Sequence, residues 1–300
     1  MSLAVLIAAA LAVAEPTPPT GVCQSAPRGR TITTPDHVSI FVRTVGSGRP
    51  VLVIPSLGRG GADFDRLART LARRGYQTIL PDPRGIGRSS GPPAKDLFDL
   101  AADDIAVIQT MCSGPVDVVG HAFGNRVARS VATIAPGRVK RVVLLAGGGE
   151  AQPTPRTLEA LLGSVAQGSK PDAQRLADLR IAFFANGHDP SVWLTGWYPD
   201  AAAMQRKAGA ATPTERWWKA GSGPVMLIQA LEDVVATPAN AMALRRDLGE
   251  RLTLVEMPHA GHAILPEQPR AVAAVINAYL SGNRSEPGLR AIVARTATAP

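Results

Sequence analysis

Apolar and polar residues follow one another along the chain in blocks whose period alternates between that of a strand and that of a helix. Short apolar runs typical of strands occupy 38–45, 51–54, 76–80, 116–119, 139–146, 224–230 and 251–256. Amphipathic stretches typical of helices lie between them, at 62–74, 96–111, 125–135, 238–248 and 266–280. Strands separated by helices form parallel sheets, because the chain must cross back over the sheet between them. The pattern therefore predicts an α/β fold, with a mostly parallel sheet flanked by helices.

This rhythm is interrupted at Gly147-Gly148-Gly149 and resumes at Pro224. Residues 150–222 carry helical patterns but no strand-like run, and they hold all 4 tryptophans of the chain. We expect a helical cap at 150–222, inserted into a core formed by 38–149 and 223–282. Such a cap would roof a ligand pocket at the carboxyl edge of the sheet. The candidate substrate-binding tryptophans are Trp193, Trp197 and Trp218; the alternative is that they fill the cap's own small core.

The two ends of the chain lie outside this core. Residues 1–14 form an apolar segment that ends Ala12-Val13-Ala14 and is followed by Pro- and Thr-rich residues. This is typical of a signal peptide with an A-x-A cleavage site, and it predicts a secreted or periplasmic protein. Because no Lys or Arg precedes the apolar segment, the alternative is an apolar tail on a cytoplasmic protein. Residues 15–37 are then an N-terminal arm, and residues 283–300 a tail without a clear period.

The chain has 2 cysteines, Cys23 and Cys112. Two thiols are too few for a zinc site built on thiolates, whereas an oxidising compartment would permit one disulfide. The sequence leaves both possibilities open, a disulfide between them and two free thiols.

The composition is that of a globular protein, 45% hydrophobic and 19% charged, with a net charge of +8 and a pI near 10.2. Nucleic-acid binding needs clustered basic residues, but here they form nothing longer than pairs such as Arg73-Arg74 and Arg245-Arg246. No apolar run reaches the roughly 20 residues of a membrane-spanning helix, and no metal, nucleotide or flavin motif is present. We expect a small-molecule substrate, no nucleic-acid partner, no membrane span and no cofactor.

The segment Gly120-His121-Ala122-Phe123-Gly124 joins an apolar strand pattern to a helix pattern. A strand, Gly-x-x-x-Gly and a helix are the arrangement of a nucleophile elbow, a tight turn that lifts its central residue off the edge of the sheet. Glycines are needed on both sides because a side chain there would collide with the neighbouring strand and helix. The central residue is Ala122.

At these residues the chain resembles the α/β-hydrolase superfamily, and the resemblance extends from about 38 to 280. Residues 51–58 (VLVIPSLG) are similar to the strand and loop that supply an oxyanion-hole amide, and 81–89 (PDPRGIGRS) resemble the family's Asp-x-Arg-Gly-x-Gly-x-Ser turn. Residues 224–233 resemble the strand that bears the catalytic acid, and 258–269 (PHAGHAILPEQP) the Gly-His-x-x-x-x-Glu-x-Pro histidine loop. The resemblance implies the α/β-hydrolase fold.

The resemblance also implies site residues. Asp233 would be the acid and His262 the base, while the backbone amides of Leu57 and Phe123 would form the oxyanion hole. The nucleophile position is Ala122, where most of the family has Ser, Asp or Cys. A methyl group cannot attack a carbonyl or carry an acyl intermediate, so ordinary acyl-enzyme hydrolysis is not expected.

Several neighbours of these motifs have alternative interpretations. Glu232 adjoins Asp233 and could be the acid instead. Ser56 could present a hydroxyl to the pocket and is a candidate substrate contact, although nothing in the sequence shows it reaching His262 as a substitute nucleophile. His121 and His259 are expected to have structural roles. Asp82 and Arg84 are expected to shape the turn after their strand, and the alternative is that they contact the ligand.

Three functions are compatible with this pattern. The favoured one is an exported enzyme that acts on a small apolar or aromatic ester, carbonyl or hydroxyl substrate by acid/base catalysis at His262 and Asp233, without a covalent acyl-enzyme, as lyases and cofactor-free oxygenases of the superfamily do. The second is a pseudohydrolase that binds a small ligand. The third is a serine hydrolase whose nucleophile is replaced by Ala. The excess of Arg is compatible with a carboxylate on the ligand.

Overall fold

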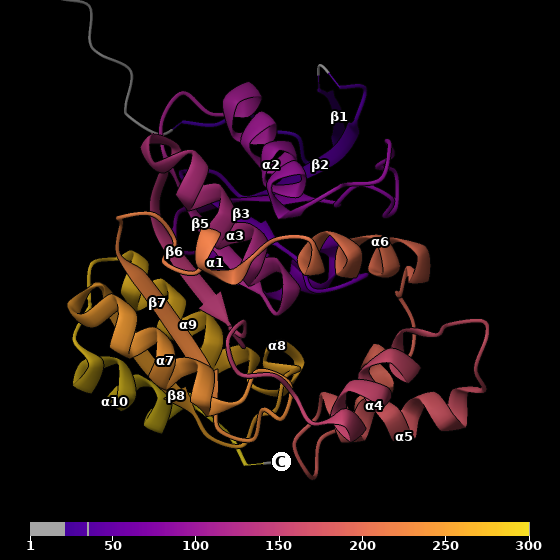
Figure 1. Cartoon of the computed structure of the whole chain (residues 1–300). Helices are drawn as coiled ribbons and strands as arrows, with labels where there is room; N and C mark the ends of the chain where they lie inside the picture. Colours follow the sequence, from indigo (N-terminus) through magenta and orange to yellow (C-terminus); the bar gives the residue numbers. More distant parts are fainter. Residues whose placement is uncertain (1–21, 35, 300) are drawn as a thin grey trace, which may run out of the picture.

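The structure is a computed structural model that describes residues 22–34 and 36–299, and one sheet of 8 strands forms its centre (Figure 1). The strand order is β1-β2-β4-β3-β5-β6-β7-β8. Strand β2 (Ser39–Val45) pairs antiparallel with β1 (Arg30–Thr33) and with β4 (Tyr76–Pro81), and every pairing from β4 onward is parallel. The other strands are β3 (Arg49–Ile54), β5 (Val116–His121), β6 (Val139–Leu145), β7 (Val225–Ala230) and β8 (Leu252–Met257). The predicted fold class is confirmed.

Helices cover both faces of the sheet, because successive side chains of a strand point to opposite faces. In β5, Val118 packs into the core of one face and Val119 into the core of the other. The first face is covered by α2 (Leu97–Met111), α3 (Phe123–Ile134) and α7 (Pro238–Leu248). The second is covered by α1 (Asp65–Ala72), α9 (Pro269–Leu280) and α10 (Glu286–Thr296). None of the helices in the described ranges combines the length and the apolar character needed to cross a membrane.

The segment between β6 and β7 is helical and adds no strand to the sheet. Figure 1 shows two of its helices, α4 and α5, beyond the edge of the sheet, with α6 running back toward the first half of the chain. A separate apolar cluster, which includes Phe183, Phe184, Trp193 and Trp197, holds it together. Its elements are α4 (Pro155–Val165), α5 (Asp172–Ala182), η3 (Pro190–Trp193), α6 (Pro199–Ala210) and η4 (Thr214–Arg216).

Two elements fall where the sequence pattern gave no signal. Strand β1 lies in the expected arm and buries one of its residues, Ile32, so it has too short an alternation to detect. Helix α10 lies in the expected tail and buries Leu289 and Val293, a stripe too narrow to stand out as amphipathic. The expected helix at 266–280 is divided between α8 (Ile264–Glu267) and α9. The expected signal peptide at 1–14 is outside the described residues.

A disulfide joins Cys23 to Cys112 and so fastens the segment before β1 to the end of α2. Two backbone hydrogen bonds flank it, from Gln24 N to Met111 O at 2.8 Å and from Ser113 N to Val22 O at 3.1 Å. Of the two alternatives that the sequence left open, the structure contains the bridge.

The bridge closes a loop of 89 residues in sequence, which restricts the unfolded chain far more than the folded one. Replacing both cysteines, Cys23→Ser with Cys112→Ser, should therefore lower the free energy of unfolding by about 3 to 4 kcal/mol. Urea unfolding followed by circular dichroism measures this, with the wild type under reducing conditions as the control. An unchanged unfolding midpoint in both samples would contradict the prediction.

Candidate active site

The turn between β5 and α3 consists of a single residue, Ala122, at φ 51° and ψ −113°. Its N–H donates to Leu145 O on the neighbouring strand β6 at 3.0 Å. A Cβ atom at Gly120 would lie 2.4 Å from Gly124 O, and one at Gly124 would lie 2.3 Å from Ile54 O. Any residue with a side chain would therefore force helix and strands apart at both positions. The methyl group of Ala122 stands where the nucleophile of an elbow would be.

An imidazole and a carboxylate are paired next to this turn. Asp233 follows β7, and its Oδ1 accepts hydrogen bonds from Val235 N at 2.8 Å and Ala236 N at 2.7 Å. Its Oδ2 lies 2.9 Å from His262 Nδ1, and the two side chains are almost fully buried. Because a carboxylate can only accept, Nδ1 carries the proton and the lone pair of Nε2 is left for a ligand. Glu232 is exposed and makes no hydrogen bond to His262 within the described part of the chain, so the alternative acid does not fit.

Two further groups fix the loop that carries His262. Burial lowers the pKa of His121 to about 3, so its ring is neutral and its Nε2 donates to His262 O at 2.9 Å. Glu267 accepts from Gly261 N at 2.8 Å and, with its other oxygen, from Ala185 N of the inserted segment at 2.7 Å. Burial outweighs these two bonds and raises the pKa of Glu267 to about 7.

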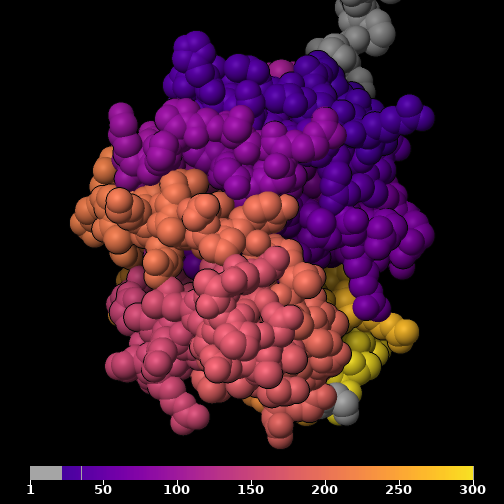
Figure 2. All heavy atoms as spheres, turned by 90° about the vertical axis from the view of Figure 1, so that its right-hand side faces the viewer, coloured from indigo at the N-terminus to yellow at the C-terminus, as the bar shows by residue number. Residues whose placement is uncertain are grey.

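The paired His262 and the elbow residue Ala122 line one cavity of about 560 Å³. Figure 2 shows the inserted helices over this side of the molecule, with a hollow between α6 and the α4–α5 pair. Leu57 and Phe123 also line the cavity, and neither of their amide N–H groups has an acceptor among residues 22–34 and 36–299. Ser56 lines it too, without a hydrogen bond to His262 in the same ranges. The cavity thus brings together a base, two free amide donors and a hydroxyl.

The tryptophans are divided between the cavity and two cores. Trp197 lines the cavity, as expected. Trp193 does not line it, because its ring packs behind Phe183 and against His121, with ring centroids 5.4 and 5.9 Å away. Trp218 does not line it either: its ring meets that of Trp217 edge to face in the main core, and its Nε1 donates to Asp247 Oδ2 at 2.8 Å. For these two, the interpretation as core residues is the one that fits.

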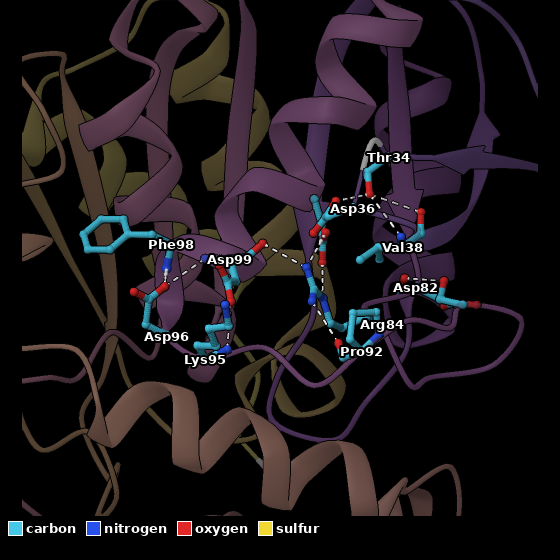
Figure 3. A network of polar contacts seen from close by, with 12 residues as sticks. Thr34, Asp36, Val38, Asp82, Arg84, Pro92, Lys95, Asp96, Phe98 and Asp99 are labelled. Atoms are coloured by element: carbon cyan, nitrogen blue, oxygen red, sulfur yellow. Dashed lines mark hydrogen bonds and ion pairs between the residues drawn. The ribbon is translucent and has the colours of Figure 1, made fainter.

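Asp82 and Arg84 shape the loop after β4 and do not line the cavity. Arg84 turns toward α2, where it donates to both oxygens of Asp103 at 2.7 Å and to the carbonyl oxygens of Pro92 and Asp99 (Figure 3). Asp82 accepts from Gly61 N at 3.0 Å. His259 is a loop residue whose carbonyl oxygen accepts from His188 and Gln268.

Two cationic side chains of the cavity wall were not among the expected site residues. Arg126 lies on α3, one turn after Phe123, and Arg206 lies on α6. The position of Arg126 three residues after Phe123 was a usable signal, since residues i and i+3 share one face of a helix. No group of three or more His, Cys, Asp or Glu side chains gathers as a metal site in the described ranges.

Comparison with known proteins agrees with the fold. A family model described as "Alpha/beta hydrolase family" matches residues 51–275. A non-heme haloperoxidase of Rhodococcus erythropolis is 37% identical over 116 residues, which are 38% of this chain but only 42% of that protein. The AB hydrolase superfamily protein YisY of Bacillus subtilis is 25% identical over 262 residues, 83% of this chain and 97% of that one. An esterase of Exiguobacterium antarcticum superposes with a TM-score of 0.71 at 18% identity over 85% of this chain and 100% of its own, a likeness of fold alone.

The raised pKa of Glu267 predicts a pH-dependent stability. Relative to the ordinary value of 4.5, a folded-state pKa of about 7 gives stability that is fully present below pH 4.5 and is lost as the pH rises through 7. The loss attributable to this residue should be about 3 kcal/mol. Glu267→Gln has no proton to lose, so its deficit against the wild type should shrink between pH 5 and pH 8.

Urea unfolding at four pH values across this range measures the deficit. Glu256→Gln, at an exposed glutamate of β8, is the matched control and should show a constant difference from the wild type. A deficit of Glu267→Gln that stays the same from pH 5 to pH 8 would overturn the assignment.

Proposed function

This chain belongs to the alpha/beta hydrolase family, and from that premise we propose that it is an enzyme in which His262 and Asp233 act as an acid/base pair without a covalent acyl-enzyme. The observation that carries the proposal is the pairing of His262 Nδ1 with Asp233 Oδ2 at 2.9 Å beside an elbow residue that has no nucleophilic atom. The relatives reported above support an enzyme of the α/β-hydrolase type in general. The substrate class we propose is a small apolar or aromatic ester, carbonyl or hydroxyl compound.

The proposed chemistry uses the free lone pair of His262 Nε2. It would take a proton from a substrate hydroxyl, from an acidic C–H or from a water molecule that attacks the substrate carbonyl. Negative charge that develops on the substrate oxygen would be stabilised by the amides of Leu57 and Phe123. The same imidazole would return the proton to the leaving oxygen or carbon, which leaves enzyme and charge unchanged. Asp233 would hold the ring in the required tautomer throughout.

Two other functions share the same cavity. A pseudohydrolase needs the cavity but gains nothing from an oriented His262–Asp233 pair. A serine hydrolase whose nucleophile is replaced by Ala would use His262, Asp233 and the two amide donors, and would lack only the serine hydroxyl at position 122. The variants below separate these functions from acid/base catalysis.

We also propose that the protein is secreted or periplasmic. The Cys23–Cys112 bridge supports this, because disulfides persist in oxidising compartments and are rare in the cytosol. The apolar segment at 1–14 would then be removed as a signal peptide.

The first test replaces the base. Wild-type protein is screened on esters, lactones and hydroxylated aromatic compounds, with and without oxygen, and His262→Ala is measured on every substrate that turns over. Loss of the general base should lower kcat/KM by about 10²- to 10⁴-fold. His37→Ala, at an exposed residue between β1 and β2 and outside the cavity lining, is the control and should keep wild-type activity. Equal rates for His262→Ala and wild type would refute acid/base catalysis by this residue.

The second test restores a hydroxyl at the elbow. Ala122→Ser should create esterase activity toward 4-nitrophenyl acetate, while the native reaction stays similar or falls because the added oxygen crowds the substrate. A large gain in the native reaction itself would identify a serine hydrolase without its nucleophile. Turnover by Ala122→Ser alone, with ligand affinity retained in His262→Ala, would identify a pseudohydrolase.

The proposed export has a direct readout. Protein recovered from the medium or periplasm of the producing cell should begin at Glu15 when its intact mass is measured. Full-length protein that retains Met1 in the cytosol would contradict the proposal.

A further inference from the structure

The charged side chains that line the cavity are of one sign. Arg126 and Arg206 line it, and no Asp or Glu side chain does so among the described residues. Asp233, behind His262, is already engaged by two backbone N–H groups and the imidazole. The cavity therefore presents cationic groups to whatever enters it.

Half-buried Arg126 differs from the buried arginines nearby in the sequence, because its guanidinium has no acceptor within the described residues. Arg84 and Arg141 each form a two-point ion pair, with Asp103 and Asp117, at 2.7 Å for every bond. Arg129, one turn further along α3, donates to the carbonyl oxygen of Gly148 and to the side chain of Asn125. The guanidinium of half-buried Arg126 makes no ion pair and no hydrogen bond within the described part of the chain.

The surroundings of Arg126 are apolar on the protein side. Its guanidinium carbon lies 5.7 Å from the centroid of the Trp217 ring, and a Cβ atom at Gly209 would be 3.6 Å from its Nη1 and 3.3 Å from the ring of Phe123. Burial lowers the pKa of Arg126, yet an arginine stays charged at neutral pH. A charged group that is partly withdrawn from water and has no acceptor in the protein gains from binding an anion.

We propose that Arg126 binds a carboxylate of the substrate, so that the substrate class of the proposed function, on which this inference rests, is a carboxylate-bearing carbonyl compound. The planar guanidinium can donate two parallel hydrogen bonds to a carboxylate. Arg126 lies three residues after Phe123 on α3, about 4.5 Å along the helix axis, so the carboxylate sits several bonds from the carbonyl held at the Phe123 amide. Exposed Arg206 attracts the anion toward the cavity.

The apolar part of the wall indicates the rest of the ligand. The large apolar side chains of the wall, besides those of Leu57 and Phe123, are Leu158, Leu161, Phe183, Trp197 and Val235. A ligand with an apolar or aromatic body and a carboxylate at one end matches this distribution.

The test uses pairs of probes that differ in charge and little else. Benzoate, phenylacetate, 3-phenylpropanoate and 4-phenylbutanoate are compared with their primary amides by calorimetric titration of the full-length protein. At least one carboxylate should bind about 10-fold or more tightly than its amide, and Arg126→Met should abolish that preference while amide affinity is kept. Arg126→Gln should lose the preference in the same way, and agreement between the two variants shows that the loss does not come from a packing defect caused by Met. The preference should survive in Arg66→Met, which removes the same charge from an exposed site on α1.

Three results would overturn the proposal: no preference for any carboxylate in the wild type, an undiminished preference in Arg126→Met and Arg126→Gln, or the same loss in Arg66→Met. The titrations are repeated with His262→Ala, in which the carboxylate preference should persist. This separates the two proposals, because loss of the acid/base function shows in turnover by His262→Ala, whereas loss of the carboxylate site shows in binding by the Arg126 variants.

Discussion

Backbone atoms of α3 and β3 approach each other at Gly124 more closely than any side chain permits, and the geometry of the whole site depends on this contact. A Cβ atom there would lie 2.3 Å from Ile54 O and 2.4 Å from Pro55 O. The contact brings the first turn of α3 to the carboxyl edge of the sheet, where the Phe123 amide has no acceptor and the helix N-terminus favours negative charge. It also leaves one residue, Ala122, to reverse the chain between strand and helix.

That reversal has a conformational cost. Ala122 adopts φ 51°, a region that residues other than glycine rarely occupy and that costs on the order of 1 to 3 kcal/mol. The surroundings hold it in place, since the Ala122 N–H donates to Leu145 O and neighbouring backbone atoms pack closely against Gly120 and Gly124. The strained turn thus orients the Phe123 amide whether or not residue 122 carries a nucleophilic atom. An oxyanion-type donor pair is therefore compatible with a methyl group at this position.

The sequence predicted the parts of this molecule whose signals are local. Seven of the strands and five of the helices that cover the sheet have periodic patterns, and the elbow and histidine-loop motifs led to Ala122, Asp233 and His262. What it could not predict depends on contacts between distant segments. Trp193, Trp197 and Trp218 look equivalent in the sequence and all three are buried, and only the position of the cavity separates Trp197 from the other two. Arg126 is unpaired because the fold brings no carboxylate of the described residues within reach of its guanidinium, and a sequence does not show which side chains become neighbours.

The inserted helices take part in positioning the site as well as covering it. At one end, Phe183 O accepts from Ala263 N at 2.8 Å and Ala185 N donates to Glu267, so the segment after α5 is bound to the loop of His262. At the other end, Gln205 accepts from Gly58 N at 2.7 Å and Tyr198 N donates to Gly58 O at 2.9 Å, next to the amide of Leu57. Any movement of these anchors would shift the base or an amide donor. We therefore expect the ligand to enter the cavity at a place where the inserted helices are not hydrogen-bonded to these two loops. The hollow between α6 and the α4–α5 pair in Figure 2 is such a place.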